Sequence, residues 1–323
     1  MRNTLRRLLA AFCLGLVAAG ASAQNFPERQ VKFVVPYPPG GFNDTLARVS
    51  AEKLNKMWNQ PVVVENRPGG NTTVGNVAVA KAPADGYTIL ITPLPFSALP
   101  GLYGANLPYD ALKDFTPLVW AGSTQNALVV RNDLPVNNVR ELLDYARKNP
   151  GKLNYGSTGS GSSNHLTMEL LMKMTGVKMA HIPYKGSAPA VTAMIGGEID
   201  VLFDNVPNVL PHIKGGRMKA IGVSGAQRSV LLPDTPTVAE AGVPGFEVNV
   251  WFGMQVPAGT PKAIVDKLNR DIVTLLKEPD VVQRFRNQGV EVAASTPEQF
   301  GALVRSEITK WTQLIREANI RIE

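Results

Sequence analysis

Short apolar runs and amphipathic segments alternate along most of this chain. Apolar runs that end near glycine, proline or asparagine occupy residues 31–35, 87–91, 128–130, 153–155, 177–181, 199–203, 218–223 and 248–256. Runs this short and this uniformly apolar are typical of parallel strands that are buried on both faces of a sheet. We therefore predict a strand for each of them.

The segments between these runs carry helix start signals. Asn138 with Glu141 forms a capping-box-like start, while Thr260 and Thr296 each precede a proline, which is favoured at the first position of a helix. Apolar residues then recur every three or four positions, as on the buried face of a helix. The alternation of strands and helices predicts an α/β fold with mostly parallel sheets.

The first 23 residues have the composition of a secretion signal. Basic positions 2, 6 and 7 precede an apolar run at 8–19, and Ala21-Ser22-Ala23 provides small residues for cleavage. The apolar run is shorter than the roughly 20 residues that a membrane-spanning helix needs. We expect cleavage after Ala23 and a periplasmic location. The only cysteine, Cys13, would leave with the signal, so the mature chain would hold no disulfide and no thiolate nucleophile.

Charge narrows the choice of partners. Removal of the signal leaves 323 − 23 = 300 residues with 33 − 3 = 30 basic and 26 acidic side chains, a net charge of about +4. The basic residues are dispersed and do not gather with aromatic residues, and the chain carries no nucleic-acid-binding signature. We expect no nucleic-acid partner and a monomeric protein.

A chain of this length has room for two domains, but no long linker divides it. We therefore predict a discontinuous arrangement, with residues 24–124 plus 251–323 in lobe 1 and residues 125–250 in lobe 2. The extended segments 120–128 and 245–251 would cross between the lobes as a hinge. Trp120 and Trp251 lie at these crossings, whereas Trp58 and Trp311 are expected on helices away from the cleft. Loops that follow strands would meet in the interlobe cleft, where open α/β sheets bind ligands.

Four of these loops share a chemistry suited to anions. Residues 36–44, 156–165, 183–189 and 203–205 are rich in small and hydrogen-bonding residues and follow predicted strands. Amide groups at a helix start favour a negative charge. Ordinary strand-to-helix connections, or a flexible linker at 156–165, remain the alternatives. None of the loops matches the phosphate-binding or dinucleotide-binding glycine patterns.

Motifs along the whole mature chain strengthen this interpretation. They include Pro36-Tyr37-Pro38-Pro39-Gly40-Gly41, Ala84-Asp85-Gly86-Tyr87-Thr88, Asp114-Phe115-Thr116-Pro117, Tyr184-Lys185-Gly186 and Val256-Pro257-Ala258-Gly259-Thr260-Pro261. With them the chain resembles the substrate-binding proteins of tripartite tricarboxylate transporters, also called Bug proteins. The resemblance implies a type II-like periplasmic-binding-protein fold, namely two α/β lobes with a hinge and an interlobe cleft. It also implies a receptor that captures a small carboxylate, largely with backbone groups and ordered water, and delivers it to membrane transporter subunits.

Two positions depart from the family pattern, and both bear on the ligand. Phe42 stands where the family usually has a small residue, and Asn71-Thr72-Thr73 replaces a more glycine-rich run. The ring of Phe42 would fill part of the cleft or offer a surface for stacking. We expect a small mono- or dicarboxylate, with an aromatic acid among the candidates.

The candidate ligand-binding residues form three groups on these loops. Arginine is absent from all of them, so a bidentate guanidinium clamp is not expected, and Lys185 is their only lysine. Asp44 is also expected to cap its helix, and Asp204 to order a loop or a water molecule. The groups are Gly40, Gly41, Phe42, Asn43 and Asp44; Thr158, Gly159, Ser160, Ser162 and His165; and Ser187, Ala188, Asp204 and Asn205.

Other function classes find less support. The three histidines outside the signal form no metal-binding pattern, no G-x-S-x-G motif occurs, and Ser50…Lys53 matches S-x-x-K without its companion motifs. We therefore expect no enzyme activity, no metal and no cofactor. A ligand sensor for a signalling system remains an alternative with the same fold and site, and an extracytoplasmic hydrolase is a weaker one.

Overall fold

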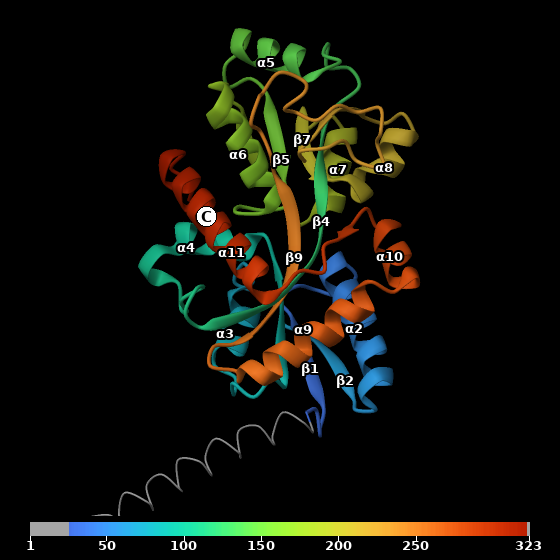
Figure 1. The fold of residues 1–323 in the computed structure, drawn as a ribbon. Coiled ribbons are helices and arrows are strands. Elements are labelled where there is room, and N and C mark those ends of the chain that lie inside the picture. The colour runs from blue at the N-terminus through green and yellow to red at the C-terminus, as the bar shows by residue number, and fades with distance from the viewer. Residues whose placement is uncertain (1–25, 322–323) are drawn as a thin grey trace, which may run out of the picture.

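The computed structural model describes residues 26–321 (Figure 1). The predicted signal and its cleavage site therefore lie outside the described residues. Within this range the strands form one curled sheet in the order β2-β1-β3-β9-β4-β7-β5-β6, and β8 and β10 also pair with β4. Helices cover both ends of this sheet (Figure 1), and within 26–321 each is too short or too polar to cross a bilayer.

The lower half of the sheet in Figure 1 holds the N-terminal strands. Their backbones pair in parallel, β1 with both β2 and β3. The apolar runs predicted β1 and β3, whereas β2 was not among the predicted strands. The elements here are β1 (Val31–Val35), α2 (Phe42–Trp58), β2 (Val62–Asn66), α3 (Thr73–Ala80), β3 (Thr88–Pro93), α4 (Pro95–Tyr103), the 3-10 helix η1 (Gly104–Asn106), α9 (Lys262–Leu276), α10 (Pro279–Arg286), β10 (Glu291–Val292) and α11 (Pro297–Glu317).

The upper half contains a second parallel set, in which β5 pairs with β6 and β7. Its elements are α5 (Val139–Lys148), β5 (Asn154–Ser157), α6 (Ser163–Thr175), β6 (Ala180–Pro183), α7 (Ser187–Ile195), β7 (Val201–Asn205), α8 (Val206–Lys214) and β8 (Lys219–Val223). The prediction placed β6 at 177–181. Val177 and Met179 are buried, but pairing with β5 begins only at Ala180. An apolar pattern predicts which residues are buried, but it does not show which of them pair in a sheet.

Two long strands connect the halves (Figure 1). Residues 115–125 of β4 (Phe115–Val130) pair with β9 (Asn249–Pro257), whereas residues 126–130 pair with β7 and β8. All of these pairings are antiparallel, so the sheet as a whole is mixed, and the prediction of mostly parallel sheets holds only within each half. The chain is therefore a two-lobed α/β protein whose lobes share β4.

Local sequence signals explain the helix ends. The Asn138 side chain accepts a hydrogen bond from the Glu141 amide at 2.9 Å, and Thr296 and Gln299 form a reciprocal capping box at the start of α11. Thr260 does not cap α9, because its hydroxyl donates instead to the Pro257 carbonyl at 2.7 Å. Helix α9 begins after Pro261.

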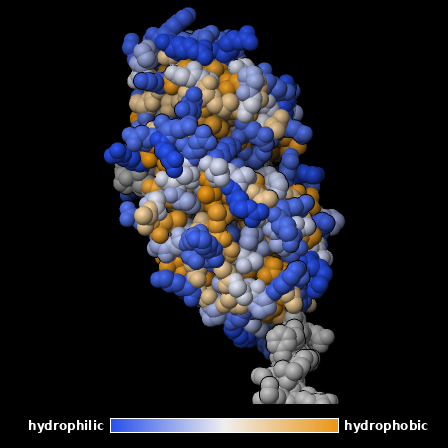
Figure 2. Space-filling view, turned by 60° about the vertical axis from the view of Figure 1, so that its left-hand side comes forward, coloured by the Kyte–Doolittle hydropathy of each residue, from blue (hydrophilic) through white to orange (hydrophobic). Residues whose placement is uncertain are grey.

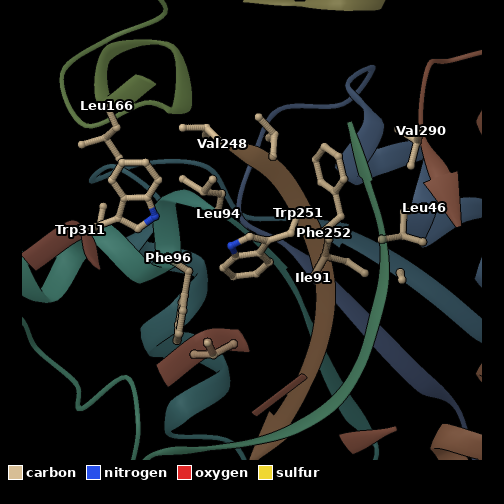
Figure 3. Close-up of a cluster of buried hydrophobic side chains, with 14 of the residues drawn as sticks. Leu46, Ile91, Leu94, Phe96, Leu166, Val248, Trp251, Phe252, Val290 and Trp311 are labelled. Atoms are coloured by element: carbon tan, nitrogen blue, oxygen red, sulfur yellow. The ribbon is translucent and has the colours of Figure 1, made fainter. Parts of the chain in front are cut away.

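The main hydrophobic core continues across the boundary between the lobes (Figure 3). Leu166 on α6 lies against Trp311 on α11, and Trp251 on β9 lies nearby. The indole nitrogens of both tryptophans donate to the same Glu307 carboxylate oxygen, at 3.2 Å from Trp251 and 2.8 Å from Trp311. Trp311 lies on a helix, as predicted, and α11 contacts both α4 of lobe 1 and α6 of lobe 2. Outside this core, polar residues cover much of the face in Figure 2, with apolar residues scattered among them.

Candidate functional site

A cavity of about 570 Å³ lies between the lobes, where the loops after β1, β5, β6 and β7 meet. These are the four loops that the sequence marked. The cavity brings together eleven of the fourteen candidate residues: Gly40, Gly41, Phe42, Asn43, Thr158, Gly159, Ser160, Ser162, Ser187, Asp204 and Asn205. Their contact with a ligand stays a prediction, but their convergence on one cavity is a property of the fold.

Four helices begin at this cavity. Gly41, Ser162, Gly186 and Asn205 are the residues that immediately precede α2, α6, α7 and α8, and all four line or adjoin the same space. The first backbone amides of a helix have no partner within the helix, and the helix dipole places partial positive charge there. The cavity therefore offers several neutral donors to an anion.

Asp44 fixes the loop that precedes α2. Its carboxylate accepts hydrogen bonds from the Gly40 amide at 3.2 Å, from Arg48 Nε at 2.8 Å and from Asn66 Nδ2 at 3.0 Å. Burial opposes ionisation of Asp44, but the hydrogen bonds from Arg48, Asn66 and Gly40 outweigh it and lower its pKa. Asp44 does not line the cavity, and its hydrogen bonds fix the Gly40 loop.

His165 supports the Ser/Gly loop in a similar way. The Gly161 amide donates to His165 Nδ1 at 3.0 Å, and the His165 ring stacks on His181 with centroids 4.0 Å apart and planes 6° from parallel. Burial, together with the neighbouring His165, lowers the pKa of His181 to about 4. His165 is buried and does not line the cavity. Its predicted place among the ligand-binding residues is not matched by the geometry, because its ring faces the underside of the loop.

Close packing fixes this loop against lobe 1. A Cβ added to Gly161 would lie 2.6 Å from Leu102 Cδ1 and 3.2 Å from Asn71 Nδ2, and Gly161 has a φ of +79°. Only glycine fits such an approach without displacing its neighbours. Thr158 is held from within lobe 2, because its hydroxyl donates to Asn164 Oδ1 at 2.7 Å.

Among the described residues, Asp204 is the only charged side chain that lines the cavity. Its carboxylate accepts hydrogen bonds from the Asn205 amide at 2.7 Å, Asn208 Nδ2 at 3.0 Å, Asn164 Nδ2 at 3.2 Å and the Ser187 hydroxyl. Burial raises the pKa of Asp204, and these four donors oppose that rise only in part. Asp204 thus joins the starts of α7 and α8. Ala188 does not line this cavity, but together with Ser187 it lines a neighbouring one.

Several lining residues were missed because nothing in the sequence singles out an isolated amide. Asn71 has a left-handed backbone, with φ of 50°, in the segment that departs from the family pattern. The buried atoms Asn43 Oδ1, Asn71 Nδ2 and Asn205 Oδ1 have no hydrogen-bond partner within residues 26–321, and all three side chains line the cavity. Buried amides are normally paired, so these three can bind a polar ligand. The other missed residues are Tyr37, Pro38, Pro93, Pro95, Thr124, Ser163, Asn164, Gly186, Pro207, Asn208, Val250, Phe252, Gln288 and Val290.

Neither a metal-binding cluster nor a serine–lysine pair is present among the described residues. No group of three or more histidine, cysteine, aspartate or glutamate side chains within 26–321 is arranged to hold a metal ion. The Ser50 hydroxyl and Lys53 do not form a catalytic pair either. Lys53 instead donates to Glu278 and Asp280, each at 2.6 Å, and so joins α2 to α10.

Comparison with known proteins agrees with this geometry. The model of the tripartite tricarboxylate transporter family receptor matches residues 46–320. The chain belongs to this receptor family. Protein BugT of Bordetella pertussis is 36% identical over 99% of this chain and 99% of its own length, which confirms the resemblance to Bug proteins.

Solved structures are similar to the receptor in fold as well as in sequence. The R. palustris protein Rpa4515, solved with adipate, is 37% identical with a TM-score of 0.82, over 92% of this receptor and 100% of that chain. MatC of Rhodopseudomonas palustris, solved with bound malate, is 32% identical with a TM-score of 0.78, over 90% of this receptor and 100% of that chain. The family therefore consists of two-lobed solute-binding receptors, as the sequence predicted.

Proposed function

We propose that this receptor works in the periplasm, after cleavage behind Ala23, and binds a small organic carboxylate in the interlobe cavity without converting it chemically. It then presents the ligand to the membrane subunits of a tripartite tricarboxylate-type transporter. The adipate and malate bound by two similar proteins support this ligand class. The observation that carries the proposal is the convergence of four helix starts on one cavity.

The cavity's chemistry favours an anion that is bound by neutral groups. Within residues 26–321 no lysine, arginine or histidine lines it. Helix-terminal amides and the unpartnered Asn71 Nδ2 can donate hydrogen bonds without a fixed cation, whereas the unpartnered Oδ1 atoms of Asn43 and Asn205 can accept from a ligand hydroxyl. Lys185 is exposed and lies outside the lining. A carboxylate fits this set because it accepts several hydrogen bonds at once.

We further propose that the ligand stabilises a closed arrangement of the lobes. Residues 24–124 plus 251–323 would form one moving body and residues 125–250 the other, with β4 and β9 as hinge strands. The cavity takes lining residues from both bodies, so a ligand contacts both. Contacts from both lobes favour the closed over the open form, which is the form a transporter can distinguish.

A thermal-shift screen of the signal-free protein tests the proposal. Malate, adipate, benzoate and related acids are compared with neutral sugars and cationic amines. A ligand that binds only the folded state at a hundred times its dissociation constant adds about 2.7 kcal/mol of stability. Shifts confined to sugars or amines would contradict the proposal, as would chemical conversion of a bound acid by the pure protein.

A variant locates the binding. Thr158→Val with Ser160→Val replaces two lining hydroxyls by methyl groups, and we expect acid binding to be lost while the unliganded protein stays folded, with a modest fall in its unfolding midpoint because Asn164 Oδ1 loses the Thr158 donor. Thr309→Val, on the exposed face of α11, is the matched control and should bind as the parent does. Binding that survives in the double variant would show that the Ser/Gly loop is only a connection.

A further inference from the structure

The cavity has two chemically different walls. The lobe 2 wall is formed mainly by hydroxyl and amide side chains, together with the Asp204 carboxylate, at the starts of α6, α7 and α8. The opposite wall is partly apolar, with the side chains of Phe42, Phe252 and Val290 from lobe 1 and of Val250 from the end of the lobe 2 segment. We call these four residues the apolar wall. Val250 and Phe252 are two residues apart on β9, so their side chains point to the same face of the strand.

Aromatic packing holds the apolar wall in place. The Phe42 ring lies 4.5 Å from Phe252 and 5.0 Å from Phe285, measured between ring centroids, with a tilted and an edge-to-face arrangement respectively. Phe285 is fully buried and Phe252 nearly so, whereas Phe42 is half-buried and borders the cavity. Phe252 and Phe285 therefore hold the Phe42 ring in place, and the part of the ring that they leave uncovered is apolar surface bordering the cavity.

The position of Phe42 relates this surface to the anion-binding groups. Phe42 is the first residue of α2 and directly follows Gly41. A carboxylate bound by the amides at the start of α2 would place the rest of its molecule beside the Phe42 ring. Aromatic rings prefer offset or edge-to-face neighbours and gain about 0.5–1.5 kcal/mol beyond the burial of their area.

The same wall disfavours a second charge. The apolar wall itself offers a second carboxylate no polar side chain, and burial of an unpaired carboxylate against apolar side chains is costly. The hydroxyl of Thr124 is occupied by the Gly289 carbonyl at 2.7 Å. Gln288 remains as a neutral polar side chain next to the wall, suited to a hydroxyl or carbonyl substituent.

We propose that the apolar wall selects carboxylates with one charged end and a flat apolar body, such as aryl monocarboxylates, over aliphatic dicarboxylates. This selectivity rests on the proposed function, since it concerns the same cavity. It separates this receptor from the similar proteins that were solved with malate and adipate. Phe42 is the residue that sets the preference.

Titration calorimetry of the signal-free protein with benzoate, 3-phenylpropionate, adipate and malate tests the selectivity. We expect an aryl acid to bind at least about tenfold more tightly than either dicarboxylate, a difference of about 1.4 kcal/mol. Phe42→Ala should weaken the aryl acid about tenfold and leave adipate within about threefold. Phe42→Leu keeps an apolar side chain and should fall between the two. Leu112→Ala, at an exposed apolar residue outside the cavity lining, is the matched control.

The outcomes separate this inference from the proposed function. Tighter binding of adipate or malate than of both aryl acids would overturn the selectivity while the carboxylate receptor stands. Equal weakening of all bound acids in Phe42→Ala would also overturn it, provided that thermal unfolding shows the variant to be folded. If Phe42→Ala does not fold, the order of the four acids on the parent protein and on Phe42→Leu decides. If no acid binds the parent protein, both proposals fail together.

Discussion

Replacement of Asn164 by alanine removes only a small side chain, but it should destabilise the receptor strongly. Asn164 is the second residue of α6 and is buried, with 4% of its surface exposed. Its Nδ2 donates to the Phe203 carbonyl at 2.8 Å and to Asp204 Oδ1 at 3.2 Å. Its Oδ1 accepts from the Thr158 hydroxyl. This one amide therefore joins the Ser/Gly loop, α6 and the end of β7.

The size of the effect follows from the groups that Asn164→Ala leaves behind. A buried polar group without its partner costs about 1–3 kcal/mol. Asp204 keeps three other donors and Thr158 can turn toward the cavity, so the main loss is at the Phe203 carbonyl, with smaller losses at the other two. We expect the free energy of unfolding to fall by about 3 kcal/mol.

Urea unfolding at pH 7, followed by circular dichroism, measures this change. The matched control is Asn132→Ala, because the Asn132 amide also donates to a backbone carbonyl, that of Gly216, but is exposed. We expect the control to lose less than about 1 kcal/mol. A loss in Asn164→Ala no larger than in the control would refute the reasoning, because it would mean that the three bonds at the cavity do not support the fold.

Two further predictions concern acid pH and lobe closure. Because its folded pKa, about 4, lies below the ordinary histidine value of about 6.5, His181 takes up its proton more readily unfolded. The contribution of neutral His181 to the free energy of unfolding is therefore present above pH 6.5 and is lost as pH falls toward 4. In urea titrations, His181→Gln should lose less stability than the parent between pH 7 and 4.5. An identical loss would refute this. Ligand addition should change tryptophan fluorescence in the single variant Trp120→Phe but not in the double variant Trp251→Phe with Trp311→Phe, because Trp251 and Trp311 lie between the lobes. A fluorescence change that is retained in the double variant would place the moving boundary elsewhere.

The sequence predicted the fold well where pattern and structure share a physical cause. Val31–Val35 forms a strand whose side chains alternate between the two faces of the sheet, and nearly all of them are buried. The largely apolar sequence reflects this burial on both faces. The reciprocal cap of Thr296 and Gln299 depends only on residues three positions apart, so it could be predicted from local sequence. The loops at 36–44 and 156–165 could be predicted for the same reason, since a small-residue loop between a strand and a helix is a local feature.

Interactions between distant segments could not be predicted in this way. Helix α11 is amphipathic, but its pattern does not say which lobe Trp311 meets. His165 was expected in the cavity because it stands in the Ser/Gly loop region, yet its partners are Gly161 and, 16 residues away, His181. Asn71, Asn208 and Phe252 reach the cavity only through the crossing of β4 and β9 and the packing of the two halves. Such residues have no signature within their own segment.

The use of neutral donors in place of a cation has a consequence for transport. Hydrogen bonds from neutral amides to a carboxylate are charge-assisted through the ligand alone, whereas a lysine or arginine in this cavity would attract any small anion. Helix-terminal amides instead depend on position, so they bind a carboxylate well only while both lobes surround it. The proposed opening of the lobes would remove part of the donor set at once, since the start of α2 and Asn71 lie on one side and the starts of α6, α7 and α8 on the other. The proposed release to a transporter would then require only a change in lobe position.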